Sequence, residues 1–341
     1  MAAKTLACEF ILMSTVLCTG GALRAQGPTQ SLQGRVVNGT TGAPVAKAEV
    51  NYVLMQRGPT PVATQTTDAQ GRFSFDNVPA PVGGAPALLR ADYQGATYNH
   101  PLLPGQRPTG EIQIQVFEAG RQPSMVSVRE HVIFLHPSGN VLLVLEQVIL
   151  ENNSNPPKTY VNPNGTYPFT LPGASRDGVQ VSVEGAAGMP LNQTPVPRDG
   201  KNTFAITYPI RPGETQVRLQ YALDYKSPFE FSKPLDVLPQ QIHVVTPGKE
   251  VQVTGDAVTA LEADPSTGFT GYLVAQKGNL VRLEVTGEVP ADKAAQLGGA
   301  DDESGTLVPI AGPVSSQRWL ILSAAGVVML AGIIFHYSRS Q

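Results

Sequence analysis

The chain of 341 residues carries a formal net charge of −3, and only 15% of its residues are charged. This balance argues against nucleic-acid binding, for which a basic surface is expected. Both cysteines, Cys8 and Cys18, stand near the N-terminus, so the remainder offers no disulfide, no cysteine-ligated metal and no cysteine nucleophile.

Residues 1–25 have the pattern of a secretory signal peptide. Lys4 precedes an apolar run that ends at Cys18, and small residues follow that run. Cleavage after Ala22 or after Ala25 fits this pattern, and an uncleaved N-terminal anchor is the alternative. Cleavage would send the following chain out of the cytoplasm.

Between residues 27 and 290, apolar positions alternate with polar ones, and no long apolar stripe of helical period occurs. The clearest alternation places five apolar side chains on one strand face: Val217, Leu219, Tyr221, Leu223 and Tyr225. Turn dipeptides containing glycine recur at Asn38-Gly39, Asp199-Gly200, Pro212-Gly213 and Pro247-Gly248. Short strands separated by such turns predict an all-β fold of tandem β-sandwich domains.

The first predicted domain covers residues 31–118. Its sequence contains LQGRVVNGTTGAPVAKAEVNYV at residues 32–53 and TTDAQGRFSFDNVP at residues 66–79. These segments resemble the carboxypeptidase regulatory-like domain of bacterial proteins. The resemblance implies a small transthyretin-like or Ig-like β-sandwich with a carbohydrate-binding-like fold. It implies no peptidase activity, because in that family the domain is an accessory to a separate catalytic domain.

A turn inside the second of these segments has a physical explanation of its own. The Asp68 side chain can accept hydrogen bonds from backbone N–H groups two residues further on. Gly71 can adopt a positive φ before Phe73 and Phe75 enter the core. We therefore expect Asp68 and Gly71 to be structural. The Pro-Gly-Tyr that the family carries before a later strand is replaced here by VGGAP at residues 82–86.

Residues 123–287 form the second predicted β-sandwich region, either one domain or two domains that meet near Thr246. The region opens with a hairpin whose strands flank a four-residue loop at residues 137–140. Centring that loop pairs His131 with Glu146. It places Val132, Phe134, Leu143 and Leu145 on one face, and Ile133, Leu135, Leu142 and Val144 on the other. Both faces are apolar near the loop, which predicts burial on both sides or a covering partner.

The C-terminal part predicts a stalk followed by a membrane anchor. Residues 288–317 are rich in Ala, Gly, Ser and Pro, as flexible linkers are. Residues 318–338 contain WLILSAAGVVMLAGIIFHY, an uncharged run that would span about 28 Å as a helix. Residues 339–341 would then be a cytoplasmic tail, with the ectodomain in the periplasm of a bacterial cell envelope. A buried core helix is the alternative. The segments FAITYPIRPGETQVRLQYALDY (204–225), PFEFSKPL (228–235) and GYLVAQKGNLVRLEVTG (271–287) resemble an ectodomain next to a C-terminal membrane helix in some bacterial proteins that also start with the regulatory-like module.

Few residues suggest catalytic or metal chemistry. The sequence contains no nucleophile-elbow, zinc-protease, P-loop or dinucleotide motif. His131 and His136 stand five apart on a predicted strand, so they point to opposite faces and cannot share a metal ion. We expect His131 to contact a carboxylate across the hairpin. Asp256, Glu262 and Asp264 could line a calcium loop, but they fit solvated loop acids better because the EF-hand ligand order is missing. The sequence predicts no catalytic residue, no metal site and no cofactor.

Two kinds of binding protein remain, besides an enzyme whose site leaves no motif. The prediction is a non-catalytic, membrane-anchored extracytoplasmic protein that binds or scaffolds a protein of the cell envelope, and no nucleic acid. A carbohydrate- or cell-wall-binding module is the alternative, because transthyretin-like sandwiches resemble carbohydrate-binding folds and tyrosines could stack on a sugar. Amphipathic tyrosines that simply lie at sheet edges and in loops are the favoured explanation of these residues. The candidate ligand contacts are Tyr93, Tyr98, Tyr160 and Tyr167.

Overall fold

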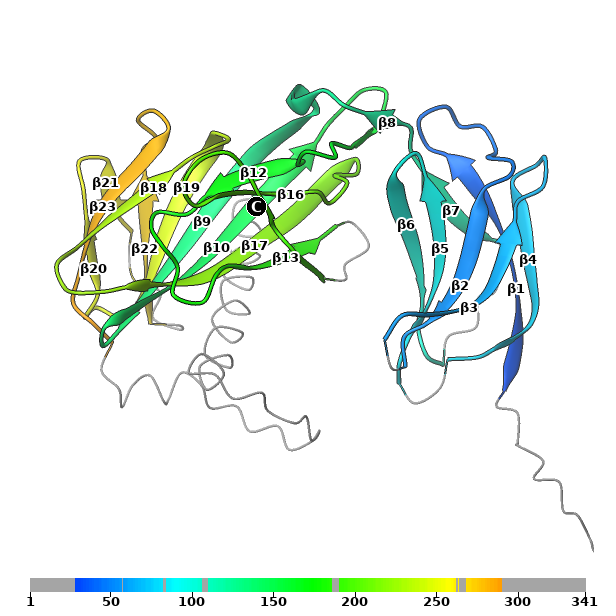
Figure 1. The fold of residues 1–341 in the computed structure, drawn as a ribbon, viewed down its shortest axis with the longest axis horizontal. Helices are drawn as coiled ribbons and strands as arrows, with labels where there is room; N and C mark the ends of the chain where they lie inside the picture. Colours follow the sequence, from blue (N-terminus) through cyan, green and yellow to red (C-terminus); the bar gives the residue numbers. More distant parts are fainter. Residues whose placement is uncertain are drawn as a thin grey trace, which may run out of the picture.

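The chain is all-β throughout the part that the computed structural model describes, as the sequence predicts (Figure 1). That part contains strands β1 to β23 and one short 3-10 helix, η1 (Pro123–Met125). The described residues are 28–56, 58–81, 84–105, 110–185, 190–261, 263 and 268–289.

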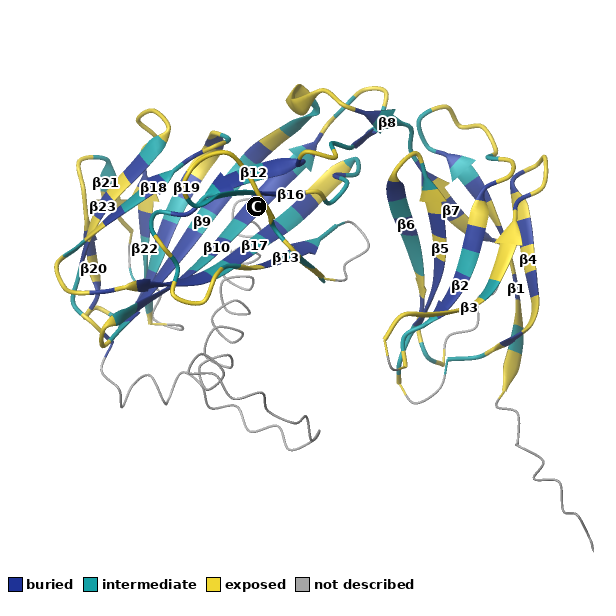
Figure 2. Cartoon of the chain, in the orientation of Figure 1, coloured by how far each residue is buried: buried dark blue, intermediate teal, exposed yellow. Residues whose placement is uncertain are grey.

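The first seven strands form the N-terminal body, which comprises the described residues up to Val116. Its two sheets have the strand orders β4-β1-β7 and β3-β2-β5-β6, with β1 antiparallel to β4 and parallel to β7. Side chains from both sheets meet in one hydrophobic cluster, in a sandwich-like arrangement. Figure 2 shows the alternation that produces it, as buried and exposed bands along the strands other than β3, which has no buried residue. The bounds are β1 (Thr29–Asn38), β2 (Glu49–Leu54), β3 (Thr60–Thr66), β4 (Arg72–Pro79), β5 (Ala87–Tyr93), β6 (Ala96–Leu102) and β7 (Ile112–Val116).

The predicted turn at Asp68 is confirmed. The Asp68 Oδ1 atom accepts hydrogen bonds from the backbone N–H groups of Gln70 (2.9 Å) and Arg72 (2.7 Å). Gly71 has a φ of 74°, and the following Phe73 and Phe75 are 5% and 1% exposed. The turn thus aims two aromatic rings into the core of the N-terminal body.

The remaining strands form the larger body, residues 126–289. One eight-stranded sheet runs through it in the order β14-β13-β17-β10-β9-β19-β22-β21, and two three-stranded sheets have the orders β12-β16-β15 and β18-β23-β20. Short strands β8 (Ala119–Gly120) and β11 (Thr159–Tyr160) pair between the two bodies. The other bounds are β9 (Val126–Ser138), β10 (Val141–Asn152), β12 (Tyr167–Thr170), β13 (Gln180–Glu184), β14 (Leu191–Gln193), β15 (Val196–Pro197), β16 (Thr203–Ile206), β17 (Gly213–Asp224), β18 (Phe229–Pro234), β19 (Pro239–Pro247), β20 (Gln252–Thr254), β21 (Val258–Ala260), β22 (Phe269–Val274) and β23 (Leu280–Thr286).

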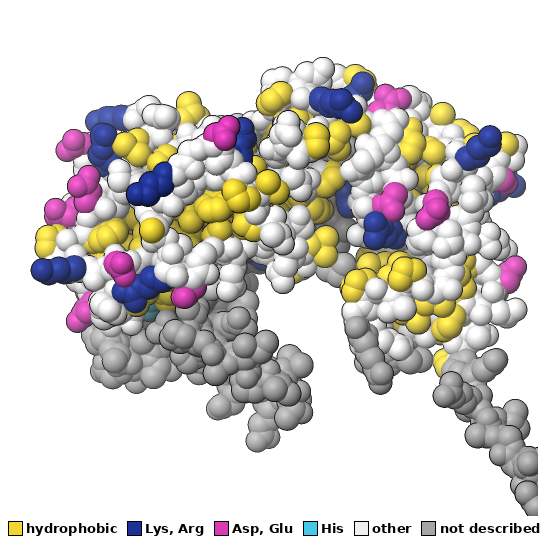
Figure 3. Space-filling view, viewed as in Figure 1, with side chains coloured by type: hydrophobic (Ala, Val, Ile, Leu, Met, Phe, Trp, Pro, Cys, Tyr) yellow, Lys and Arg dark blue, Asp and Glu magenta, His cyan; other side chains and the backbone are white. Residues whose placement is uncertain are grey.

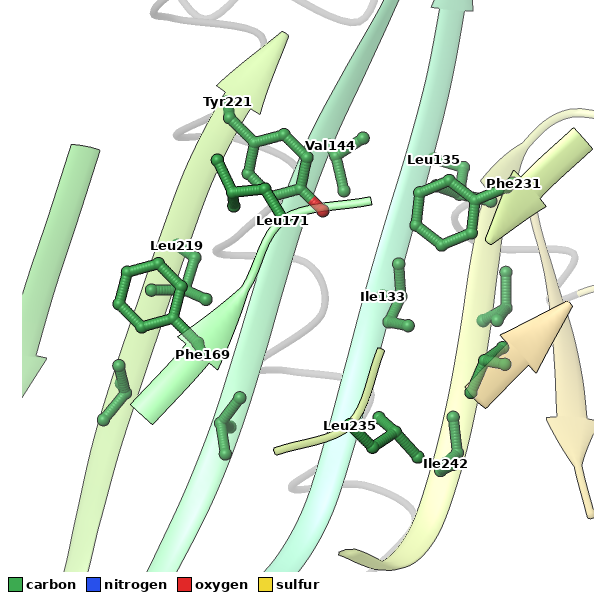
Figure 4. Packing of buried hydrophobic residues seen from close by; sticks show 14 of the residues in the cluster. Ile133, Leu135, Val144, Phe169, Leu171, Leu219, Tyr221, Phe231, Leu235 and Ile242 are labelled. Atoms are coloured by element: carbon green, nitrogen blue, oxygen red, sulfur yellow. The ribbon is translucent and has the colours of Figure 1, made fainter. Parts of the chain in front are cut away.

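The core of the larger body lies between the eight-stranded sheet and the two smaller ones. Figure 4 shows Phe231 from β18 beside Leu135, and Phe169 from β12 beside Leu219 of β17. The predicted alternation is confirmed, because Val217, Leu219, Tyr221 and Leu223 of β17 are buried, as is Tyr225 directly after the strand. A single hydrophobic cluster extends from Val128 to Val289, and the large sheet includes strands on both sides of Thr246. These residues therefore share one core, with no division near Thr246.

The predicted register of the long hairpin is wrong by two residues. β9 and β10 pair His131 with Val148 and Ile133 with Glu146. Ser138 pairs with Val141, so the loop has two residues, and Gly139 adopts a φ of 58°. Two-residue turns with positive φ match the twist of the flanking strands, whereas the four-residue loop would have ended the pairing earlier. Because a shift of two residues preserves the faces, the predicted division into two apolar faces still holds.

Several predictions fall outside the described residues. They concern the signal peptide at residues 1–25, the stalk from residue 290 onward, the anchor at 318–338, and the calcium candidates Glu262 and Asp264. Across the described ranges, no helix has the length and apolar character needed to cross a membrane.

Replacing Gly71 tests how strictly the turn depends on glycine. A Cβ atom at position 71 would lie 2.6 Å from the Val36 carbonyl oxygen, in addition to the strain of a positive φ. We expect Gly71→Ala to lower the free energy of unfolding by about 2–5 kcal/mol. The measurement is urea unfolding of the full chain, followed by far-UV circular dichroism.

Gly42→Ala is the matched control, because Gly42 has a φ of 77° and no heavy atom within 4 Å of the added Cβ. It should cost about 1–2 kcal/mol, the backbone strain alone. Equal costs for the two variants would contradict the close approach at Gly71.

Candidate functional site

Four ionisable side chains meet in the core of the larger body, and we call them the buried ionic cluster: His131, Glu146, Tyr221 and Lys233. Glu146 is fully buried, and Lys233 and His131 are each 2% exposed. His131 Nε2 lies 2.7 Å from Glu146 Oε2, so the predicted contact between His131 and a carboxylate is confirmed. The Tyr221 hydroxyl donates a hydrogen bond of 2.5 Å to Glu146 Oε1, and Lys233 Nζ lies 3.1 Å from the same oxygen.

The cluster is assembled from four strands in two layers. Glu146 stands on β10, with His131 on the neighbouring β9 and Tyr221 on the neighbouring β17. Lys233 comes from β18 in the opposite layer, and its ammonium group also donates to the backbone oxygen of Thr170 at the end of β12 (2.7 Å). The ion pair therefore connects the large sheet to both smaller sheets.

The surroundings fix the protonation state of two members. Burial on its own raises the pKa of the Glu146 carboxyl, but the Lys233 ammonium and the hydrogen bonds from His131 and Tyr221 outweigh burial and lower this pKa to about 2. Burial raises the pKa of Tyr221 well above its usual 10, and the adjacent Glu146 charge raises it further. At neutral pH, Glu146 is thus ionised and Tyr221 is protonated. The cluster is a permanent ion pair inside the protein, with no face open to a substrate.

A second polar arrangement lies where the two bodies meet, and we call it the junction. The Tyr98 hydroxyl, on β6, is 2.7 Å from Thr159 Oγ1 on β11, and the Arg211 guanidinium lies over the Tyr98 ring, 5.0 Å from its centroid. Thr40 Oγ1 donates to the Pro157 backbone oxygen (2.6 Å) and accepts from the Glu118 backbone N–H (3.0 Å). Side chains of both bodies are therefore hydrogen-bonded to each other.

Main-chain pairing reinforces the junction. β8 and β11 run parallel, and the Val161 N–H donates to the Gly120 oxygen (2.9 Å). Val161 also packs against the hydrophobic cluster of the N-terminal body. An arginine over a tyrosine ring combines cation–π attraction with hydrogen bonding, and such contacts strengthen as water is excluded. Sequence reasoning missed the junction because its members stand as far apart as Thr40 and Arg211.

The structure does not bring the four candidate tyrosines to one surface. Tyr98 is 3% exposed at the junction, and Tyr160 (3%) and Tyr167 (6%) belong to the core of the larger body. Burial raises the pKa of both Tyr98 and Tyr167. Only Tyr93 is partly exposed, with its hydroxyl near Gln94 Nε2 (3.2 Å). Three of these rings are thus used in packing and leave no face for a sugar.

A groove of about 650 Å³ lies on the N-terminal body, and polar and apolar residues of β1, β3 and β4 line it. Gln33, Gln65 and Ser74 contribute amide and hydroxyl groups, and Arg72 and Glu111 contribute charges. Such a groove could hydrogen-bond a polar ligand. None of the four candidate tyrosines lines it.

A metal site is not visible in the described ranges, where no group of three His, Cys, Asp or Glu side chains is placed to hold an ion. Comparison with known proteins does not assign the chain to a family: no family model matches it, and no curated protein matches it.

Removing one charge from the buried ionic cluster should destabilise the fold strongly. Glu146→Gln leaves the Lys233 ammonium buried without its counterion, which costs about 3–5 kcal/mol of unfolding free energy. Combining Glu146→Gln with Lys233→Met removes both charges and should recover part of that loss. Chemical unfolding of the full chain measures both.

The exposed pair Arg35–Glu111 is the matched control, since both of its side chains are almost half exposed. Glu111→Gln should change the unfolding free energy by less than about 1 kcal/mol. A Glu146→Gln effect no larger than that of Glu111→Gln would show that the buried pair is not stabilising in the folded state.

The low pKa of Glu146 also predicts how stability depends on pH. Its folded pKa of about 2 lies below the ordinary 4.5, so between these values the unfolded state binds more protons. The contribution of ionised Glu146 to the free energy of unfolding is therefore complete above pH 4.5. About 3 kcal/mol of this free energy is lost as the pH falls towards 2. Unfolding curves at several pH values should show this slope, and Glu146→Gln should flatten it. An unchanged slope in the variant would contradict the assignment.

Proposed function

We propose that the protein is a non-catalytic, membrane-anchored protein that binds or scaffolds a component of the bacterial cell envelope. Two β-sandwiches, a regulatory-like one over residues 31–118 and a larger one over residues 123–287, form its ectodomain. A stalk over residues 288–317 and an anchor over residues 318–338 hold this ectodomain at the outer side of the cytoplasmic membrane.

The junction is the observation that carries this proposal. A flexible linker would suit two bodies that act independently, whereas the contacts of Thr40, Tyr98 and Arg211 with the partner body fix their relative placement. A fixed placement lets side chains from both bodies contribute to one binding surface. It also removes the entropy cost of ordering the bodies when a partner binds.

The surface of the larger body supports a protein partner. Figure 3 shows hydrophobic side chains gathered over its middle on one face, around β12 and β16, with charged side chains around them. Val196 and Leu238 are 43% and 54% exposed. Apolar surface with a polar border is typical of protein-binding sites. A carbohydrate ligand remains the alternative, and the groove on the N-terminal body, with its amide and hydroxyl groups, is the feature that favours it.

Crosslinking in native membranes, followed by gentle solubilisation and purification, tests the proposal. We expect the full chain to retain a defined envelope protein, and a chain lacking Trp319–Tyr337 to retain less of it. The reason is that a shared membrane raises the effective concentration of the partner. Protease added to spheroplasts should also digest the ectodomain and leave a C-terminal stub.

Two variants separate the junction from general surface effects. Arg211→Ala removes the guanidinium over Tyr98 and should reduce retention of the partner, whereas Arg90→Ala, in an exposed ion pair with Asp92, should not.

Full protection from external protease would contradict the topology. Binding is refuted if no envelope protein is retained while the purified chain turns over a substrate in a hydrolase screen.

A further inference from the structure

One end of the large sheet is apolar on its outer face, the face that points away from the core of the larger body. The pairing of β9 with β10 and β19, and of β10 with β17, places apolar side chains side by side there. We call this area the apolar outer face: Val132, Phe134, Leu143, Leu145, Ala222 and Val245. His243 and Glu130, 3.8 Å apart, lie beside Val132 on the same face. Leu273 on β22 extends it and is 41% exposed. Towards β13 the same face becomes polar, with Gln180, Gln216 and Arg218.

The two smaller sheets of the larger body pack on the inner face, so the described strands provide no second layer over the outer one. Phe134, Leu143 and Ala222 are at most 6% exposed, yet none of them belongs to either core cluster. His136 stacks on Phe134 with ring centroids 6.4 Å apart, and burial lowers the pKa of this histidine. A neutral imidazole adds no charge to the area at pH 7. Val132, Leu145 and Val245 on the same face are partly exposed, and exposed apolar surface is normally covered by another element or a partner.

The described chain ends at the hairpin of β9 and β10, which borders this face, and the Val289 side chain packs in the core cluster of the larger body. The Val289 N–H donates a hydrogen bond of 3.0 Å to the Pro137 oxygen, one residue from His136. Residues 290–318 lead from there to the uncharged segment Trp319–Tyr337. As a coil, a connector of this length reaches about 30 Å, comparable with the length of the sheet. The segment can therefore reach the whole apolar outer face.

We propose that the apolar outer face is the docking surface for this chain's own segment Trp319–Tyr337 whenever that segment lies outside a bilayer. The apolar outer face and the uncharged segment are both apolar, and contact between them removes apolar side chains of both from water. The connector holds the segment at an effective concentration in the millimolar range, which favours it over a second copy or a separate protein. Entry of the segment into a bilayer leaves the face free. This inference goes beyond the proposed function, which places the segment only in the membrane.

Site-specific photo-crosslinking in the full chain tests the inference. The photoreactive residue p-benzoylphenylalanine is placed at position 145, in the apolar outer face, or at position 180, in the polar part of the same face, as a matched control. Each chain is made by cell-free synthesis, either without membranes or with phosphatidylcholine vesicles present. Trypsin cuts after Arg318 and Arg339, so a single peptide reports the segment.

Without vesicles, position 145 should give an intrachain adduct with peptide 319–339 at least fivefold above position 180. Vesicles should reduce that adduct at least fivefold. A second reporter at position 132 guards against misfolding of one variant and should behave as position 145 does. The inference is overturned if positions 145 and 132 give no intrachain adduct above position 180, or if their adducts join two copies or another protein.

The two proposals can fail separately. An intrachain adduct that persists undiminished with vesicles would support docking and contradict the membrane anchor. Alkaline extraction of the vesicle sample shows independently whether the chain is inserted. A chain that inserts but never forms the adduct would refute docking and leave the anchor in place.

Discussion

The larger body is organised around a carboxylate that no water reaches. A buried charge is tolerated only when its partners are close and well oriented, because the cost of leaving water must be offset. Glu146 meets this condition with groups from three other strands: His131, Tyr221 and Lys233. Since Lys233 comes from the opposite layer, the layers must close in the alignment that delivers its ammonium group. Hydrophobic burial alone tolerates sliding between layers, but an ion pair of this kind does not.

The junction follows the same physical rule with weaker interactions. Asn152, at the end of β10, is 2% exposed and donates to the backbone oxygens of Lys158 and Ile210. These bonds hold the segment that carries Thr159 in place, and Thr159 meets Tyr98 of the other body. The hydrogen bonds of the Asn152 amide therefore connect the large sheet to the segment that contacts the N-terminal body. Asn152, Thr159 and Tyr98 all have hydrogen-bond partners, as burial requires, whereas the buried Arg211 Nε has none.

Features governed by local chemistry were predictable from the sequence. Alternation identified the buried face of β17, and the Asp68–Gly71 turn followed from one carboxylate and one glycine. The two faces of the hairpin were also predicted correctly, because the side of the sheet to which a side chain points depends only on whether its position along the strand is odd or even. The register of the hairpin was not, since the turn is centred one residue later, between Gly139 and Asn140, which keeps the parity but moves every pair by two residues. The pairing of Glu146 with Lys233 was beyond sequence reasoning, because the two residues lie 87 positions apart in different sheets.

The place where the described chain ends has a mechanical consequence. A tensile force applied to the chain beyond Val289 acts first on Val289 and then on β23, the strand that ends shortly before Val289. β23 is the central strand of its sheet, hydrogen-bonded to β18 on one side and to β20 on the other. A tensile load on β23 is thus divided between two rows of backbone hydrogen bonds, and its side chains Val281, Leu283 and Val285 are anchored in the core. The body therefore resists extension at the end where a tether would transmit force.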